Sequence, residues 1–192
     1  MKSIYIIFLF SILIPNSKFN ISVEASNIQW KGSKSNGSYH EGLIMIQDGF
    51  INIKNDTIQN GIISINMNSM TCTDILNEGS NQSLINHLKN DDFFSTDKFP
   101  YSVLTINNVK HAQNNDYIIQ ADLTIKDITH PIEFLANIKI TSNGAIASGV
   151  MIINRAKYEI KYKSKTWYEN LGDRFIHDNF DLYFTLLANS KE

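Results

Sequence analysis

Side chains that could bind a metal ion are few in this chain of 192 residues, and their spacing fits no common site. The five histidines, His40, His87, His111, His130 and His177, occur in no H-x-H, H-E-x-x-H or mixed histidine and cysteine spacing. Such spacings let neighbouring imidazole and thiolate groups converge on one zinc ion. The sequence therefore predicts no metal site and no cofactor.

Nucleophilic and acid–base groups are equally sparse. Cys72 is the only cysteine, and no residue beside it marks it as an activated thiolate. Asp91 and Asp92 are adjacent, so at the end of a helix their carboxylates would point in different directions and make a poor general acid and base. The chain contains no G-x-S-x-G motif and no glycine-rich phosphate loop. These observations predict no catalytic residue and favour a binding protein over an enzyme.

Charge and composition argue against a nucleic-acid-binding protein. The formal net charge is −2, from 17 basic and 19 acidic residues, so the chain as a whole does not attract DNA or RNA. Tyrosines and lysines do alternate over residues 158–165, and we interpret this segment as a solvent-facing strand. The hydrophobic content of 43% is that of an ordinary folded domain.

The N-terminal segment predicts a signal peptide over residues 1–25. Lys2 precedes an apolar run over residues 4–14, which is too short to span a bilayer. Val23 and Ala25 occupy the −3 and −1 positions of a cleavage site near Ala25. An uncleaved membrane anchor is the alternative. Cleavage predicts a periplasmic or secreted protein without a membrane span, whose single cysteine forms no internal disulfide.

Four segments alternate apolar and polar residues with the period of a β-strand. They cover residues 61–67, 117–126, 131–140 and 179–188. Each would turn one face to solvent and the other to an apolar interior. The inward positions that we expect to contact a ligand are Ile63, Ile65, Met67, Leu123, Ile125, Phe134, Ile138, Phe180, Leu182 and Phe184.

Turn-forming sequences separate about eight such strands, which predicts one all-β domain over residues 26–192. Sequential antiparallel strands with one buried face form a sandwich or a closed barrel. Long strands favour the barrel, and an eight-stranded barrel can enclose one small ligand. One short amphipathic helix is predicted near residues 83–90, followed by the adjacent aromatic residues Phe93 and Phe94. We expect this helix and its aromatic pair to act as a lid over the cavity, with at least one of the two rings lining it and contacting the ligand. The alternative is that the two rings only hold the helix against the barrel.

Several motifs occur in an order that is specific as a set. The first is Trp-x-Gly-x-Lys followed by Gly-x-x-His-x-Gly, at Trp30, Gly32, Lys34, Gly37, His40 and Gly42. Ser69 and Asp74 follow the next strand, and "HLKNDDFFSTDKFP" covers residues 87–100. "LTIKDITHP" covers residues 123–131, and "INRAKYEIKY" begins a C-terminal arm at residue 153. Over residues 27–189 the chain resembles the YceI-like family.

This resemblance implies a lipocalin-like, extended antiparallel β-barrel of eight strands. Members of the family are exported, and some hold a polyisoprenoid chain in the barrel. The sequence departs from the family pattern at Glu159, where glycine is frequent, and at Asn154, where aspartate is common. Both positions lie in one stretch, so the departure concerns the local backbone there and leaves the fold unchanged.

Five polar or amphipathic residues are candidates for contact with a lipid head group. Trp30, His40, Tyr158 and Trp167 could donate or accept hydrogen bonds, and Arg155 could pair with a phosphate. Three of them have a structural alternative. Trp30 and His40 could instead satisfy backbone groups at strand ends, and Arg155 could form an ion pair within the protein.

The sequence and the resemblance together predict an exported carrier of an isoprenoid or another long-chain amphipathic lipid. One alternative is a barrel with a filled core that acts in protein contacts or stress protection. A second is an enzyme that modifies such a lipid, although the inward faces show no polar cluster for it. The oligomeric state is open, a homodimer included.

Overall fold

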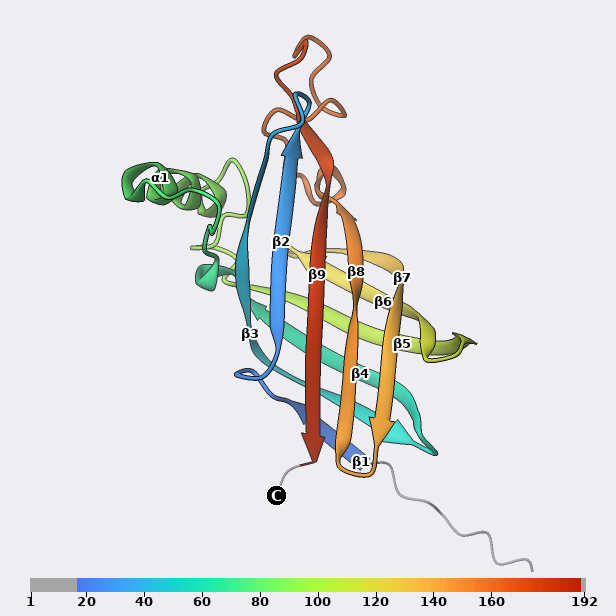
Figure 1. Cartoon of the computed structure of the whole chain (residues 1–192). Helices are drawn as coiled ribbons and strands as arrows, with labels where there is room; N and C mark the ends of the chain where they lie inside the picture. The colour runs from blue at the N-terminus through green and yellow to red at the C-terminus, as the bar shows by residue number, and fades with distance from the viewer. Residues whose placement is uncertain (1–16, 191–192) are drawn as a thin grey trace, which may run out of the picture.

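Antiparallel strands wrap into one closed barrel with eight strand positions around its wall (Figure 1). The computed structural model describes residues 17–190. Its strands are β1 Ser17–Ile21, β2 Asn27–Lys34, β3 Tyr39–Lys54, β4 Thr57–Asn66, β5 Tyr101–Gln113, β6 Asp116–Ile125, β7 Ile128–Thr141, β8 Gly144–Asn154 and β9 Ile176–Ser190. The order around the wall follows the chain from β2 to β9, and the pairing of β2 with β9 closes the barrel. The predicted all-β class and eight-stranded antiparallel barrel with one short helix are confirmed.

The first strand shares one barrel position with the second. β1 pairs with β3 through Phe19 and Ile51, and with β9 through Ile21 and Ala188. β2 pairs with the same two neighbours farther along the barrel. Phe19 and Ile21 are buried, so β1 is part of the wall and of the core. The wall of the barrel thus includes residues before the expected boundary at residue 26. In the sequence these residues directly follow an apolar run that resembles a signal peptide, so they were assigned to that peptide.

Strand alternation produces an apolar interior. In β6 the side chains of Ile119, Ala121, Leu123 and Ile125 are buried, whereas the residues between them are partly exposed. The same alternation holds in the other segments in which the sequence showed it, and their inward residues join one core cluster or pack against it. The strands are long, with 16 residues in β3 and 15 in β9, so the barrel is deep enough to contain an elongated cavity.

Two of the four two-residue hairpin connections have positive φ at both residues. Asn55 and Asp56 join β3 to β4, and Lys126 and Asp127 join β6 to β7. All four residues have positive φ, between 51° and 59°. This is the conformation of a two-residue type I′ turn, whose twist matches that of the flanking strands. These turns fix the register on which the inward faces depend.

The only α-helix of the described residues is α1, Glu78–Lys89. Asn77 caps its N-terminus by accepting a hydrogen bond from the backbone N–H of Ser80 at 2.9 Å. The helix therefore starts earlier than expected from the apolar pattern and ends before Phe93 and Phe94. Those two phenylalanines lie in the turn that returns the chain from the helix to the barrel.

The tyrosine- and lysine-rich segment is a loop and not the strand that its alternation indicated. After β8 the chain forms a short 3₁₀ helix, Arg155–Tyr158, and then a series of turns up to β9. Glu159 and Lys163 have positive φ values of 54° and 48°. Backbone in the left-handed region cannot continue a strand ladder, so the prediction of a strand here was wrong.

Replacing Glu159 by glycine should raise the free energy of unfolding by about 1 kcal/mol. A side chain in the left-handed region has a steric cost that glycine avoids. The only ion pair of Glu159 in the described structure is with Lys161 at 3.9 Å, and its exposure makes its loss a small effect. Urea unfolding would measure the change. Lys157→Gly, within the 3₁₀ helix, is the control and should destabilise. A lower stability for E159G would contradict this reading of the backbone.

Candidate functional site

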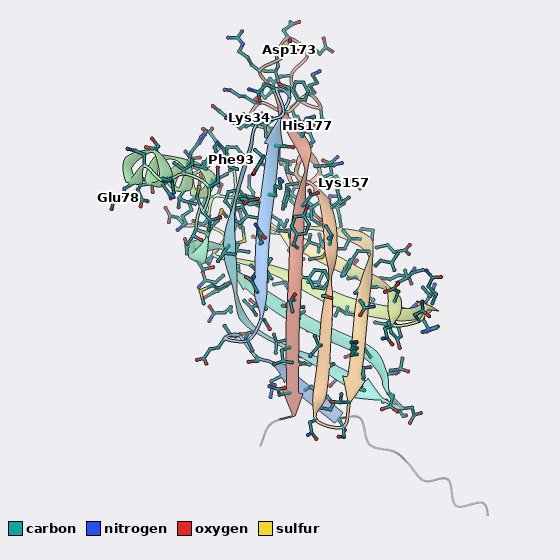
Figure 2. The ribbon with its side chains drawn as sticks, viewed as in Figure 1. Lys34, Glu78, Phe93, Lys157, Asp173 and His177 are labelled. Atoms are coloured by element: carbon teal, nitrogen blue, oxygen red, sulfur yellow. The ribbon has the colours of Figure 1, made fainter. Side chains whose placement is uncertain are left out.

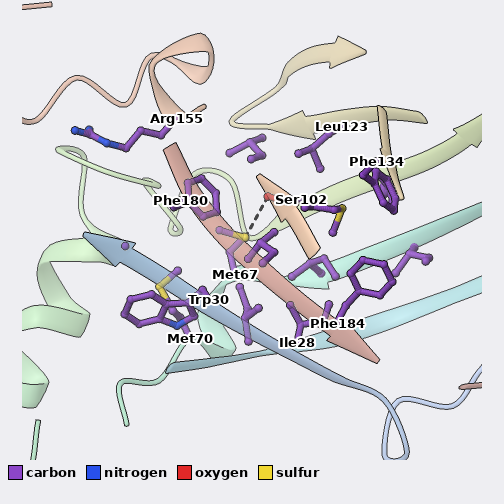
Figure 3. A pocket seen from close by; sticks show the side chains of 18 of the residues that line it. Ile28, Trp30, Met67, Met70, Ser102, Leu123, Phe134, Arg155, Phe180 and Phe184 are labelled. Carbon is purple, nitrogen blue, oxygen red and sulfur yellow. Dashed lines mark hydrogen bonds between the residues drawn. The ribbon is translucent and has the colours of Figure 1, made fainter. Parts of the chain in front are cut away.

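The barrel encloses an apolar cavity of about 350 Å³. Every strand from β2 to β9 contributes side chains to it, and most of these are aliphatic or aromatic. Figure 3 shows how side chains such as Trp30, Phe134, Phe180 and Phe184 project from different strands toward this space. An enclosed space of this lining can accommodate hydrocarbon and offers few hydrogen bonds to a polar molecule.

All twelve side chains that the sequence placed toward a ligand line this cavity. They are Ile63, Ile65, Met67, Phe93, Phe94, Leu123, Ile125, Phe134, Ile138, Phe180, Leu182 and Phe184. The strand residues among them reach the cavity because alternate side chains of a strand point to the same face. Their contact with a bound molecule stays a prediction.

One end of the cavity, here called the mouth, is formed by α1, the turn after it and the loop over residues 159–175. Lys34, His87, Phe93, Tyr162 and Lys163 line the cavity there. Figure 2 shows Phe93 on the side of the barrel that carries α1. The cavity extends from the mouth to the opposite end of β8 and β9, where Ala145 pairs with Ala188.

Aromatic contacts connect the helix to the loop across the mouth. The His87 ring packs edge-on against Phe93 at 5.0 Å and against Tyr162 at 4.5 Å between centroids. Phe94 packs edge-on against Phe180 of β9 at 6.4 Å. Phe93 is buried and Phe94 is partly buried. The two phenylalanines thus lie between the helix and the barrel interior, as a lid over the cavity requires.

Trp30 and His40 line the cavity, and their polar atoms bond to the same loop of the protein. The indole N–H of Trp30 donates to the carbonyl oxygen of Thr71 at 3.0 Å. His40 Nδ1 lies 2.8 Å from Asp74 Oδ2. Burial raises the pKa of the Asp74 carboxyl, but hydrogen bonds from the Glu41 N–H and from His40 outweigh burial and hold the pKa below its usual value. Both side chains therefore fasten the loop after β4 to the barrel.

Arg155 is at the edge of the cavity, but its donors are already engaged. Its side chain donates hydrogen bonds to the carbonyl oxygens of His177, Ile160 and Ile176, at 3.2, 2.8 and 3.0 Å. Its Nη2 also lies 3.4 Å from Asp178 Oδ1. With only 4% of its surface exposed, Arg155 holds the loop onto β9. This arrangement fits the structural alternative better than a phosphate contact.

Tyr158 and Trp167 do not line the cavity. Tyr158 is 1% exposed and packs edge-on against His130, because the 3₁₀ helix turns it under the loop. Trp167 is 42% exposed on the loop itself. Sequence alternation could not place either residue, since both follow the last residue of β8 and belong to no strand.

The alkaline stability of the protein should depend on Tyr158. Burial raises the pKa of its phenol to about 12, against about 10 in an unfolded chain. Below pH 10 both states are protonated and the stability is complete. Between pH 10 and 12 only the unfolded state loses the proton, so about 2–3 kcal/mol of stability should disappear. The free energies of unfolding of the original protein and of Y158F, measured in urea at several pH values over this range, would test this. An equal dependence on pH in the two proteins would contradict it.

Cys72 is buried, and its thiol donates a hydrogen bond to Asp74 Oδ1 at 3.2 Å. Burial and the neighbouring carboxylate raise the pKa of the thiol, so its thiolate is disfavoured. This supports the interpretation of Cys72 as an unreactive side chain.

Within residues 17–190 no group of three or more histidine, cysteine, aspartate or glutamate side chains could hold a metal ion. None of the helices in that range has the length and apolar composition to cross a membrane.

Sequence reasoning missed the helix and loop residues of the mouth. Leu84, His87 and Leu88 of α1 line the cavity, as do Tyr162 and Lys163 of the loop. The spacing of Leu84, His87 and Leu88 is that of one helical face, which was a usable signal. For Tyr162 and Lys163 there was none, because a loop has no periodicity.

Comparison with solved structures places the barrel among known folds. Burkholderia cenocepacia BcnA superimposes with a TM-score of 0.67 over 88% of this chain and 99% of its own, at 15% identity. A polyisoprenoid-binding domain from Saccharophagus degradans gives 0.66 over 90% and 98%, at 16% identity. A Campylobacter jejuni YceI protein gives 0.58 over 77% and 84%, at 22% identity. At these identities the likeness shows the fold alone.

Sequence comparison gives a closer assignment. A UPF0312 protein of Staphylococcus aureus is 34% identical over 89 residues, which are 43% of this chain. The match covers 49% of that protein, so the chain spans about half the length of the curated relatives it matches. The family model of the YceI-like domain matches residues 19–188, from β1 to the end of β9.

Proposed function

The chain belongs to the YceI-like family, and from that premise we propose that it binds a long-chain lipid, a polyisoprenoid or one of similar shape, inside its barrel. The observation that carries this proposal is the lining of the cavity. Apolar side chains surround it along the length of the barrel, and the polar atoms of Trp30, His40 and Arg155 at its edge are engaged within the protein. The polyisoprenoid-binding domain with the same fold supports the choice of lipid.

The energetics of such binding require no charged anchor. Burial of hydrocarbon stabilises a complex by roughly 0.8 kcal/mol per methylene. About a dozen methylenes would contribute on the order of 10 kcal/mol before the costs of association and ordering. One polar contact inside the wall, from the Ser102 hydroxyl to Met67 Sδ at 3.1 Å, is satisfied within the protein (Figure 3). It therefore makes no demand on the ligand.

Mass spectrometry of organic extracts from the purified protein would test the proposal. We expect an isoprenoid or similar lipid in about equimolar amount, and uptake of a fluorescent prenyl analogue by the protein after its lipid is removed. A protein of similar size expressed and extracted in the same way provides the background. If the extracts contain no lipid and the protein does not take up the prenyl analogue, the carrier proposal is refuted and a barrel with a filled core is favoured.

Binding without chemical conversion is the second part of the proposal. An enzyme would need an acid, base or nucleophile against the ligand, and two candidate groups at the cavity edge are engaged with the protein: His40 with Asp74, and Arg155 with Asp178. Incubation of the loaded protein should therefore return the lipid unchanged. A product that disappears in H40A would overturn this.

Export of the protein is also proposed, on the basis of its N-terminal sequence. The apolar run lies outside the described residues, whereas residues 17–25 lie within them. Cleavage near Ala25 would remove β1 and the buried Phe19 and Ile21, and would open the wall between β3 and β9. This favours cleavage close to Ser17. N-terminal sequencing of protein from the exported fraction would decide between the two positions.

A further inference from the structure

We propose that the rim of the mouth docks onto the surface of a lipid bilayer that contains anionic lipids. The mouth rim consists of two segments, residues 31–39, from the end of β2 to the first residue of β3, and the loop over residues 159–175. Lys34 and Lys163, one from each segment, line the cavity. A surface that contacts the bilayer here would place the mouth end of the cavity next to the lipid.

The two segments are bonded into one surface at the same end of the barrel. The backbone N–H of Ser35 donates to the carbonyl oxygen of Phe175 at 3.1 Å, and that of Ile176 to the carbonyl oxygen of Lys163 at 2.9 Å. Lys34 is paired with Ile176 in the sheet. Figure 2 shows Lys34, Asp173 and His177 together at this end. The mouth rim is therefore a single platform and not two independent loops.

The mouth rim is basic in a chain that is acidic overall. Residues 159–175 contain four basic and three acidic residues, and residues 31–39 contain two lysines and no acidic residue, so the rim has a formal charge of +3. The whole chain has a net charge of −2, so the other residues are strongly acidic in sum. The acidic groups of the rim are Glu159, Glu169 and Asp173; of these Glu159 is paired with Lys161 at 3.9 Å. The described structure shows no carboxylate paired with Lys34, Lys163 or Lys165.

Exposed aromatic side chains lie between these lysines. Tyr39, Trp167 and Tyr168 are 45%, 42% and 50% exposed. Lys31 lies 3.9 Å above the Tyr39 ring, and Lys161 lies 4.0 Å above the Trp167 ring. Tyrosine and tryptophan partition into the head-group region of a bilayer, and lysines beside them reach anionic head groups. The combination distinguishes a membrane surface from a soluble anion, which would need no exposed apolar rings.

Vesicle flotation would test the docking. The protein should bind vesicles of phosphatidylcholine with phosphatidylglycerol more tightly than vesicles of phosphatidylcholine alone. K31E/K161E/K165E, which changes three rim lysines that do not line the cavity, should weaken the anionic binding on the order of a hundredfold, since each lysine contributes about fivefold. The matched control K54E/K110E/K139E replaces three exposed strand lysines outside the rim and so alters the net charge by the same amount. This control should bind within about twofold of the original protein. Thermal unfolding would verify that both variants are folded.

Two results would overturn the proposal. One is equal affinity of the unaltered protein for neutral and anionic vesicles, and the other is an equal loss in the two lysine variants, which would indicate net charge alone. W167A/Y168A should lower the affinity in high salt, where the lysines are screened. Docking onto the bilayer does not depend on lipid binding inside the barrel. A role of docking in the transfer of that lipid does depend on it, and so rests on the proposed function. The rim variant should therefore retain the fluorescent prenyl analogue, and failure of that uptake in all variants would refute the carrier proposal alone.

Discussion

Filling the cavity from within should abolish lipid binding while the barrel stays folded. Ala147 of β8 lines the cavity and is paired with Ile138 and Leu186. Ala147→Trp would place an indole in the space that the hydrocarbon needs. Displacing three methylenes would cost about 2.4 kcal/mol of binding, and each further methylene adds about 0.8 kcal/mol. We expect the affinity for a prenyl probe to fall on the order of a hundredfold.

The neighbouring residue provides the matched control. Ile146 is on the same strand, but its side chain points outward and is 49% exposed. Ile146→Trp adds a similar volume to the outer surface and should leave probe affinity within about twofold. Equal affinities for A147W and the unaltered protein would show that the ligand does not occupy this part of the barrel.

Replacing Arg155 by methionine should lower the free energy of unfolding by about 3–5 kcal/mol. The substitution leaves three backbone carbonyl oxygens without their donor and the Asp178 carboxylate without its counter-ion. Burial raises the pKa of Asp178, but the hydrogen bond from the Thr166 hydroxyl and the charge of Arg155 outweigh burial and hold the pKa of the carboxyl below its usual value. Chemical denaturation would measure the loss.

Two further variants distinguish the effect of the buried hydrogen bonds and ion pair of Arg155 from the effect of removing a positive charge from this loop. Arg174→Met removes an exposed arginine of the same loop and should change stability by less than about 0.5 kcal/mol. Adding Asp178→Asn to Arg155→Met should restore part of the stability, because it removes the stranded charge. A loss below about 1 kcal/mol for Arg155→Met would contradict this assignment of its hydrogen bonds.

The interior of the barrel could be predicted from the sequence because strand geometry is periodic. Alternation in four segments was enough to identify ten inward side chains, from Ile63 to Phe184, and each lines the cavity. The adjacent Phe93 and Phe94 were identified differently, as an aromatic pair after a short helix. Where a repeating backbone sets the direction of a side chain, residue type and spacing carry the information.

The remaining features depend on the backbone between the periodic segments. Alternate tyrosines and lysines indicated a strand after Asn154, but the left-handed residues Glu159 and Lys163 turn the chain into a loop. The polar first turns of α1 have no apolar periodicity, so only its second half was visible. β1 could not be separated from the apolar run before it. In each case the conformation depends on caps, turns or strand pairing, which leave no periodic pattern in the sequence.

The pairing of β1 and β2 with β9 determines when this protein can fold. Phe19 lies opposite Ser190, so the wall closes only between residues near the two ends of the chain. Until β9 has emerged from the ribosome, β2 and β8 both have an unpaired edge, and such edges bind other strands. Pairing across so long a sequence separation is slow, because the closure entropy must be lost before contacts form. A nascent chain therefore cannot close its barrel before β9 is available to pair with β2 and β8.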